Sequence, residues 1–215
     1  GNNGCGKSTF CKTLNGLIPQ FISGDFSGSV IVDGLDTTTT DVGTLARKVG
    51  YVYQDFENQI IRPTVLDDAS YACLNYAMTD YLERGKKALE ACGLLHKQDS
   101  YIWQLSGGQT HLLALAGVLS LEPEVLILDE PTSALDGVSE AQIKEALTRL
   151  MAGRITLIVA HRLTTIEHAD QILALADGRI VESGSWQELI ERNGLFAKLC
   201  RLQGINAKGE QEDAA

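Results

Sequence analysis

Apolar residues recur along the chain in two patterns, one typical of amphipathic helices and one typical of buried strands. Four apolar side chains on one face predict a helix over 7–18, while short unbroken apolar runs predict strands at 125–129 and 156–160. Helix and strand signals that alternate in this way are typical of an α/β fold with a parallel sheet. The other predicted elements are strands at 29–34 and 49–54, a mostly helical segment at 64–97, helices at about 107–121 and at 138–151, and a hairpin at 171–184.

Turn and capping residues add detail to the C-terminal part. Asp177-Gly178 predicts the turn of the hairpin. Ser185, with Glu188 three residues later, predicts a capping box that opens the last helix. The final residues read INAKGEQEDAA, and this polar composition predicts a disordered tail.

Charge and cysteine content narrow the classes of function. The chain has 215 residues and a formal net charge of −10, which disfavours nucleic acid and anionic lipid as partners of the whole surface. Its five cysteines form no CxxC pair, so neither a disulfide framework nor a zinc site is indicated, and a reducing compartment fits best. The longest apolar run, 112–121, is too short to cross a bilayer.

The chain opens with a phosphate-loop pattern. Residues 1–8 read GNNGCGKS and match this pattern at every required position. Glycines at 1, 4 and 6 allow backbone conformations that a β-carbon would forbid, so successive N–H groups can face phosphate oxygens. The N-terminus of the following helix adds partial positive charge. In such a loop Lys7 neutralises the β- and γ-phosphates, and the Ser8 hydroxyl coordinates Mg²⁺.

A second motif is the acidic end of the apolar strand VLILDEP at 125–131. Two adjacent carboxylates are costly in a core, but at the carboxyl end of a parallel strand they face the ligand crevice. Asp129 is therefore predicted to hold the Mg²⁺ shell. Glu130 is predicted to polarise the water that attacks the γ-phosphate.

A third motif is LSGGQ at 105–109, at the start of a predicted helix. Ser106 can cap this helix, while Gly107 and Gly108 leave its first N–H groups open to an anion.

With all three motifs at this spacing, the chain resembles the nucleotide-binding domain of an ABC transporter, an ABC ATPase. The resemblance covers nearly the whole chain. Gln54 matches the glutamine loop of that family, Asp136 in SALD matches its D-loop, and His161 matches its switch histidine.

The resemblance implies the fold, an α/β P-loop NTPase with a mostly parallel sheet flanked by helices and an inserted α-helical subdomain. The implied domains are a RecA-like core at 1–54 and 117–203, a helical subdomain carrying the signature motif at 55–116, and a disordered tail at 204–215. Since family members carry a strand before the phosphate loop, we expect this chain to be N-terminally truncated and to lack its first core strand.

The resemblance also implies the site and its partners. ATP and Mg²⁺ are the expected cofactors. A second ABC ATPase subunit, identical or related, is expected to complete each ATP site. Transmembrane subunits are expected to anchor the ATPase peripherally on the cytoplasmic side of the membrane. No nucleic-acid partner is expected. The implied catalytic residues are Glu130, His161 and Gln54; the metal ligands are Ser8, Gln54 and Asp129; the nucleotide-binding residues are Gly1, Asn2, Asn3, Gly4, Cys5, Gly6, Lys7, Ser8, Thr9, Ser106, Gly107, Gly108, Gln109 and Asp136.

Three types of ABC ATPase remain open. Segments such as LNGLIP (14–19) and TVLDDASY (64–71) resemble energy-coupling factor importers of vitamins or metal ions, which we favour. The C-terminal third, IVAHRLTTIEHADQILALADGRIVESGSWQELI, resembles an exporter instead. A non-transport ABC ATPase is the remaining alternative, but only 97 residues separate Lys7 from Leu105, without the sustained heptads of a coiled-coil insertion.

Some positions depart from the family pattern. Thr110, His111 and Leu112 replace the usual polar-basic run after LSGGQ, and Asp55-Phe56 replaces the usual Asn/Asp-Pro after the glutamine. Cys5 lies inside the phosphate loop, where a thiol at a helix N-terminus can become reactive. A small residue tolerated at a variable position is the simpler interpretation of Cys5.

Overall fold

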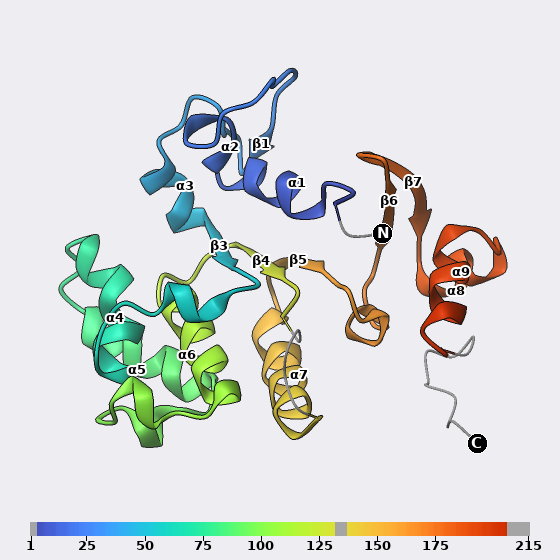
Figure 1. Cartoon of the computed structure of the whole chain (residues 1–215). Coiled ribbons are helices and arrows are strands. Elements are labelled where there is room, and N and C mark those ends of the chain that lie inside the picture. The colour runs from blue at the N-terminus through green and yellow to red at the C-terminus, as the bar shows by residue number, and fades with distance from the viewer. Residues whose placement is uncertain (1–3, 132–136, 206–215) are drawn as a thin grey trace.

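A three-stranded parallel sheet forms the centre of the molecule (Figure 1). The computed structural model describes residues 4–131 and 137–205. The strands are β3 (Val49–Val52), β4 (Val125–Asp129) and β5 (Ile155–Val159), in the order β3-β4-β5. This arrangement confirms the predicted α/β fold with a parallel sheet, although β3 ends two residues earlier than expected.

Alternate residues of the central strand β4 enter two different cores. Leu126 and Leu128 pack in the larger core, together with the helices on one side of the sheet. Ile127 packs in a smaller core on the other side, with Cys11 of α1 (Lys7–Leu14). In Figure 1, α1 accordingly lies on one side of the sheet and α6 and α7 lie on the other. Burial of both faces explains why β4 is apolar at every position before its acidic end.

Several helices pack on the large core and on one another. They are α4 (Val65–Asn75), α5 (Tyr81–Ala91), α6 (Gly107–Leu119) and α7 (Gly137–Met151), with short 3₁₀ segments η1 (Phe56–Gln59), η2 (Leu95–Lys97) and η3 (Ile102–Gln104). Within the described residues, no helix is both long and apolar enough to cross a bilayer. The expected domain boundary between 116 and 117 lies inside α6, and the division into core and subdomain stays a prediction.

The N-terminal segment differs from its prediction in three ways. The helix predicted over 7–18 ends at Leu14, because Gly16 adopts a left-handed conformation with φ of 76°, and α2 (Leu17–Gln20) follows. The strand predicted at 29–34 is instead a short hairpin of β1 (Ile31–Val32) and β2 (Leu35–Asp36). Helix α3 (Val42–Lys48), which the apolar pattern did not indicate, begins where Asp41 accepts a hydrogen bond from the Thr44 amide.

The C-terminal segment follows its turn and capping signals closely. β6 (Ile172–Ala176) and β7 (Arg179–Gly184) pair antiparallel around Asp177 and Gly178, which both have positive φ. Ser185 and Glu188 form the predicted capping box, which opens α8 (Trp186–Glu191). However, α8 is not the last helix, because α9 (Leu195–Leu202) follows it. The 3₁₀ segment η4 (Leu163–Ile166) precedes the hairpin. Ile205 is buried against α9, so packing extends past the expected end of the core at 203.

Candidate functional site

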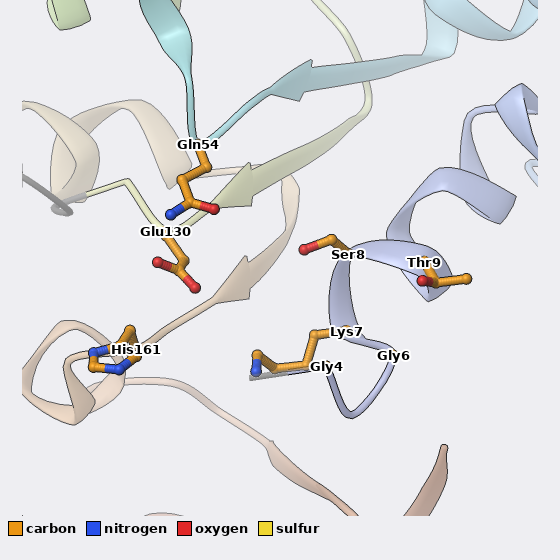
Figure 2. A pocket seen from close by; sticks show the side chains of 8 residues that line it. All are labelled: Gly4, Gly6, Lys7, Ser8, Thr9, Gln54, Glu130 and His161. Carbon is orange, nitrogen blue, oxygen red and sulfur yellow. The ribbon is translucent and has the colours of Figure 1, made fainter. Parts of the chain in front are cut away.

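A cavity of about 450 Å³ opens at the carboxyl ends of the three parallel strands. Its lining residues come from the phosphate loop and from the ends of β3, β4 and β5: Gly4, Gly6, Lys7, Ser8, Thr9, Gln54, Glu130 and His161. Figure 2 shows Gln54, Glu130 and His161 on one side of the cavity and the phosphate loop facing them. This edge of an open parallel sheet is where α/β proteins bind their ligands.

The phosphate loop has the backbone geometry that its glycines predict. Gly4 and Gly6 have φ of 81° and 97°, a region that residues with a β-carbon rarely adopt. Helix α1 begins directly after Gly6, with no side chain capping its first amides and no acidic residue in its first turn among the described residues. Such uncapped amides at a helix N-terminus fit an anionic phosphate. The Lys7 ammonium reaches into the same cavity and lies 3.7 Å from the Cys5 sulfur.

The expected metal ligands Ser8, which lines the cavity, and Asp129 contact each other at the phosphate-loop side of the site. The Ser8 hydroxyl donates a hydrogen bond of 3.1 Å to Oδ1 of Asp129, across 121 positions of sequence. Hydroxyl and carboxylate oxygens are ligands that Mg²⁺ prefers, so this pair fits a magnesium ion beside the phosphate loop. Such an ion, when bound, would neutralise phosphate charge.

Glu130 has a strained backbone. Its φ is 53°, in the left-handed region, while its N–H donates a hydrogen bond of 2.8 Å to the carbonyl of Val159 on β5. The strand pairing of β4 and β5 therefore continues through the strained residue and fixes its direction. In Figure 2 the carboxylate points into the cavity. Strain of this kind is concentrated at functional sites, which is consistent with the role predicted for Glu130.

Comparison with known proteins identifies the family of the chain. The family model described as ABC transporter matches residues 1–133. The chain belongs to the ABC transporter family. Members of this family hydrolyse ATP, so the chain is the ATP-binding, ATP-hydrolysing domain of a transporter.

Among the relatives of this ABC ATPase are proteins of more than one transport type. An ABC transporter ATP-binding protein of Pyrococcus abyssi is 41% identical over 89% of this chain and 70% of its own length. An ATP-dependent lipid A-core flippase of Ralstonia nicotianae is 38% identical over 94% of this chain and 35% of its own length.

Solved structures show the same range. A bacterial Atm1-family ABC exporter with ATP bound matches with a TM-score of 0.79 and 28% identity, covering 100% of this chain and 36% of that one. The cbiO1 protein of Clostridium perfringens, part of the ABC transporter complex cbiONQ, matches with a TM-score of 0.77 and 30% identity, covering 94% of this chain and 81% of that one.

The signature segment of the ABC ATPase does not line the cavity formed by the described residues of its own chain. The Ser106 hydroxyl caps α6 by accepting a hydrogen bond of 3.3 Å from the Gln109 amide, and the Gln109 side-chain oxygen accepts one of 3.1 Å from the Ser106 amide. Gly107 is exposed beside this cap, whereas Gly108 is buried. Of the other expected nucleotide-binding residues, Gly1, Asn2, Asn3 and Asp136 lie outside the described residues.

Two glutamines hold the loops that carry Gln54 and His161, and our sequence analysis missed both. The Gln59 side chain accepts from the Tyr53 amide (2.8 Å) and donates to the Tyr51 carbonyl (3.0 Å), which supports the end of β3 next to Gln54. The Gln203 side chain, at the end of α9, donates to the His161 carbonyl (2.7 Å) and accepts from the Leu163 amide (3.0 Å). No local pattern marks Gln203, because its partners lie about 40 positions earlier in the chain.

Two of the positions that depart from the family pattern, Phe56 and His111, contact each other. Their rings stack with centroids 4.2 Å apart and an interplanar angle of 11°. The stack joins the segment after Gln54 to α6, the helix that begins within LSGGQ. His111 is only 3% exposed, and burial lowers its pKa to about 4, so the ring is neutral at physiological pH. Two of the departures from the family pattern thus form one internal contact.

Proposed function

We propose that this ABC ATPase binds MgATP with its phosphates over residues 4–9 and hydrolyses it at the ends of β4 and β5. The observation that carries the proposal is the convergence of the phosphate loop, Gln54, Glu130 and His161 on one cavity. Lys7 would offset the phosphate charge. Ser8, Asp129 and Gln54 would hold the magnesium ion; the described residues form no cluster of three or more histidine, cysteine or acidic side chains that could hold a metal.

Glu130 is the residue proposed to orient the attacking water. Its carboxylate enters the cavity from the strained turn after β4, opposite the phosphate loop. His161, from the loop after β5, would contact the γ-phosphate on the same side. Both side chains are held on strand ends, which keeps them in a fixed geometry relative to the phosphates.

A second ABC ATPase subunit is proposed to complete the site. Ser106 and Gly107 are exposed at the start of α6 and lie outside the cavity of their own chain. In the proposed head-to-tail dimer, this helix start faces the γ-phosphate bound by the partner subunit. The uncapped amide of Gly107 would then contribute to binding, as at other helix N-termini.

We favour an energy-coupling factor type importer of vitamins or metal ions, with the ATPase bound peripherally to membrane subunits on the cytoplasmic side. The importer-like segments at 14–19 and 64–71 support this, as does the likeness to cbiO1 of the cbiONQ complex.

An ABC exporter is the second candidate. Its support is the exporter-like C-terminal third and the 36–41% identity to exporter relatives. Purification of the native complex separates them, because an importer ATPase co-purifies with separate membrane subunits and an exporter carries its membrane domain in the same polypeptide.

The catalytic role is tested by Glu130→Gln in the full-length protein. The neutral amide keeps the shape of the side chain but cannot accept the proton, so hydrolysis should fall by about 10²- to 10⁴-fold while ATP binding is retained. Glu124→Gln, at the opposite end of the same strand, is the matched control; Glu124 contacts exposed Lys48 and should leave turnover unchanged. Hydrolysis by Glu130→Gln at the wild-type rate would assign the base to another residue.

A further inference from the structure

Asp129 has a second hydrogen-bond donor that the family motifs do not assign. The hydroxyl of Tyr51, in the middle of β3, lies 2.9 Å from Oδ2 of Asp129. The two residues are 78 positions apart in sequence and are brought together by the pairing of β3 with β4. Tyr51 is 6% exposed and Asp129 is 5% exposed, so the contact is shielded from water on both sides.

The direction of this hydrogen bond is fixed by the chemistry of the two groups. The Tyr51 hydroxyl is a phenol, which is protonated at neutral pH and donates to the carboxylate oxygen. An ionised carboxylate only accepts hydrogen bonds. A charge-assisted bond of this kind is stronger than one between neutral groups.

The Tyr51 ring is itself held in place. It stacks on Tyr53, two residues further along β3, with centroids 4.3 Å apart and an interplanar angle of 25°. On the same side of the sheet it packs in the small core with Cys11 and Ile127. The hydroxyl therefore reaches Asp129 from a rigid support.

The two oxygens of Asp129 accept from donors on different elements. Oδ1 accepts from Ser8 at the start of α1, and Oδ2 accepts from Tyr51 on β3. Because a carboxylate is planar, anchoring both oxygens fixes its rotation about the side-chain bond. Oδ1 is thereby kept toward the phosphate loop, where Ser8 marks the expected metal position.

We propose that Tyr51 is a positioning residue for the magnesium ion, which it serves by holding Asp129 with Oδ1 directed at Ser8. The inference rests on the proposed function in one respect, namely that Ser8 and Asp129 hold the metal of MgATP. Hydrogen bonds that orient a metal-bound carboxylate typically contribute 10- to 100-fold to metal affinity. A tyrosine with a structural role alone would contribute to folding and leave the metal requirement unchanged.

The test compares Tyr51→Phe with Tyr53→Phe in the full-length protein. Both variants remove one hydroxyl from the same stacked pair, but the Tyr53 hydroxyl contacts Asn15 and not Asp129. Binding of a fluorescent ATP analogue is measured against Mg²⁺ concentration and in EDTA, together with the melting temperature. Tyr51→Phe should raise the Mg²⁺ concentration for half-maximal binding by about 10- to 100-fold, with binding in EDTA unchanged. Tyr53→Phe should leave the Mg²⁺ requirement at the wild-type value.

A double-mutant cycle shows whether Tyr51 acts through Asp129. Asp129→Asn should raise the Mg²⁺ concentration for half-maximal binding. Adding Tyr51→Phe to this variant should raise that concentration no further. Additive losses, equal effects of Tyr51→Phe and Tyr53→Phe, or a lower melting temperature with an unchanged Mg²⁺ requirement would each overturn the inference. If wild-type binding did not depend on Mg²⁺ at all, the metal assignment of the proposed function would fail first, and the inference with it.

Discussion

Acidification should destabilise this ABC ATPase through the buried side chain of His111, on α6. His111 is stacked on Phe56, and its Nδ1 atom finds no hydrogen-bond partner among the described residues. Burial lowers its pKa from 6.5 to about 4 because a charged imidazolium would lose its hydration. Replacing the residue by Phe keeps an aromatic ring against Phe56 and removes the titrating group.

The magnitude follows from linkage between proton binding and folding. The unfolded chain binds a proton at His111 below pH 6.5, whereas the folded chain does so only near pH 4, so the unfolded state binds more protons between these values. The stabilising contribution of the neutral ring is therefore complete above pH 6.5 and is lost as the pH falls toward 4. These two pKa values give a loss of about 1 kcal/mol at pH 6 and about 2 kcal/mol at pH 5.

The assay is urea unfolding of the wild type and His111→Phe at pH values from 7.5 to 5. The free energy of unfolding of the wild type should fall by about 2 kcal/mol more than that of the variant over this range. His96→Gln is the matched control, because His96 is exposed in η2 and its removal should leave the pH dependence as in the wild type. If the wild type and His111→Phe lost equal stability on acidification, the idea that burial of His111 controls it would be refuted.

Two further substitutions test the phosphate loop and the packing of α4 against α5. Lys7→Ala should weaken ATP binding by at least about 10- to 100-fold in calorimetric titration, because the phosphates lose a charged donor. The control Lys12→Ala, further along α1, should bind ATP as the wild type does. Wild-type ATP affinity in Lys7→Ala would contradict the role assigned to Lys7. Gly85→Ala should lower the free energy of unfolding by up to about 2 kcal/mol, because the new methyl group would lie 3.1 Å from the Ser70 backbone nitrogen. The overpacking costs about 1–3 kcal/mol, and the gain in helix propensity offsets about 1 kcal/mol of it. Lys86→Ala, exposed on the same helix, should change stability little in the same urea titration, and an unchanged midpoint for Gly85→Ala would show that α4 and α5 can move apart.

Local sequence signals predicted the features that depend on neighbouring residues. The strand at 125–129 is apolar because both faces of the sheet are covered, and its acidic end is conspicuous for the same reason. Asp177-Gly178 and the Ser185 capping box are complete within a few residues of sequence, so both were confirmed. The parallel sheet and the family followed from such local signals as well.

Features that depend on distant partners were beyond the reach of the pattern. Apolar periodicity continues through Leu17 and Ile18, but the positive φ of Gly16 stops the helix at Leu14, and the pattern of side chains does not report a backbone angle. Gln203 supports the loop of His161 from about 40 positions away. Such contacts exist only after the chain has folded, so neither residue could be assigned a role from sequence alone.

In the proposed magnesium site, the choice of donors around Asp129 would let one buried carboxylate both pack and hold a cation. Among the described residues, Ser8 and Tyr51 both donate to it through neutral hydroxyls. An ammonium or guanidinium partner would also satisfy the carboxylate, but it would offset the negative charge that attracts Mg²⁺. Hydroxyl donors reduce the cost of burial and leave that charge in place. The tyrosine in the otherwise apolar centre of β3 is therefore better explained by the electrostatics of Asp129 than by packing, since phenylalanine would fill the same space.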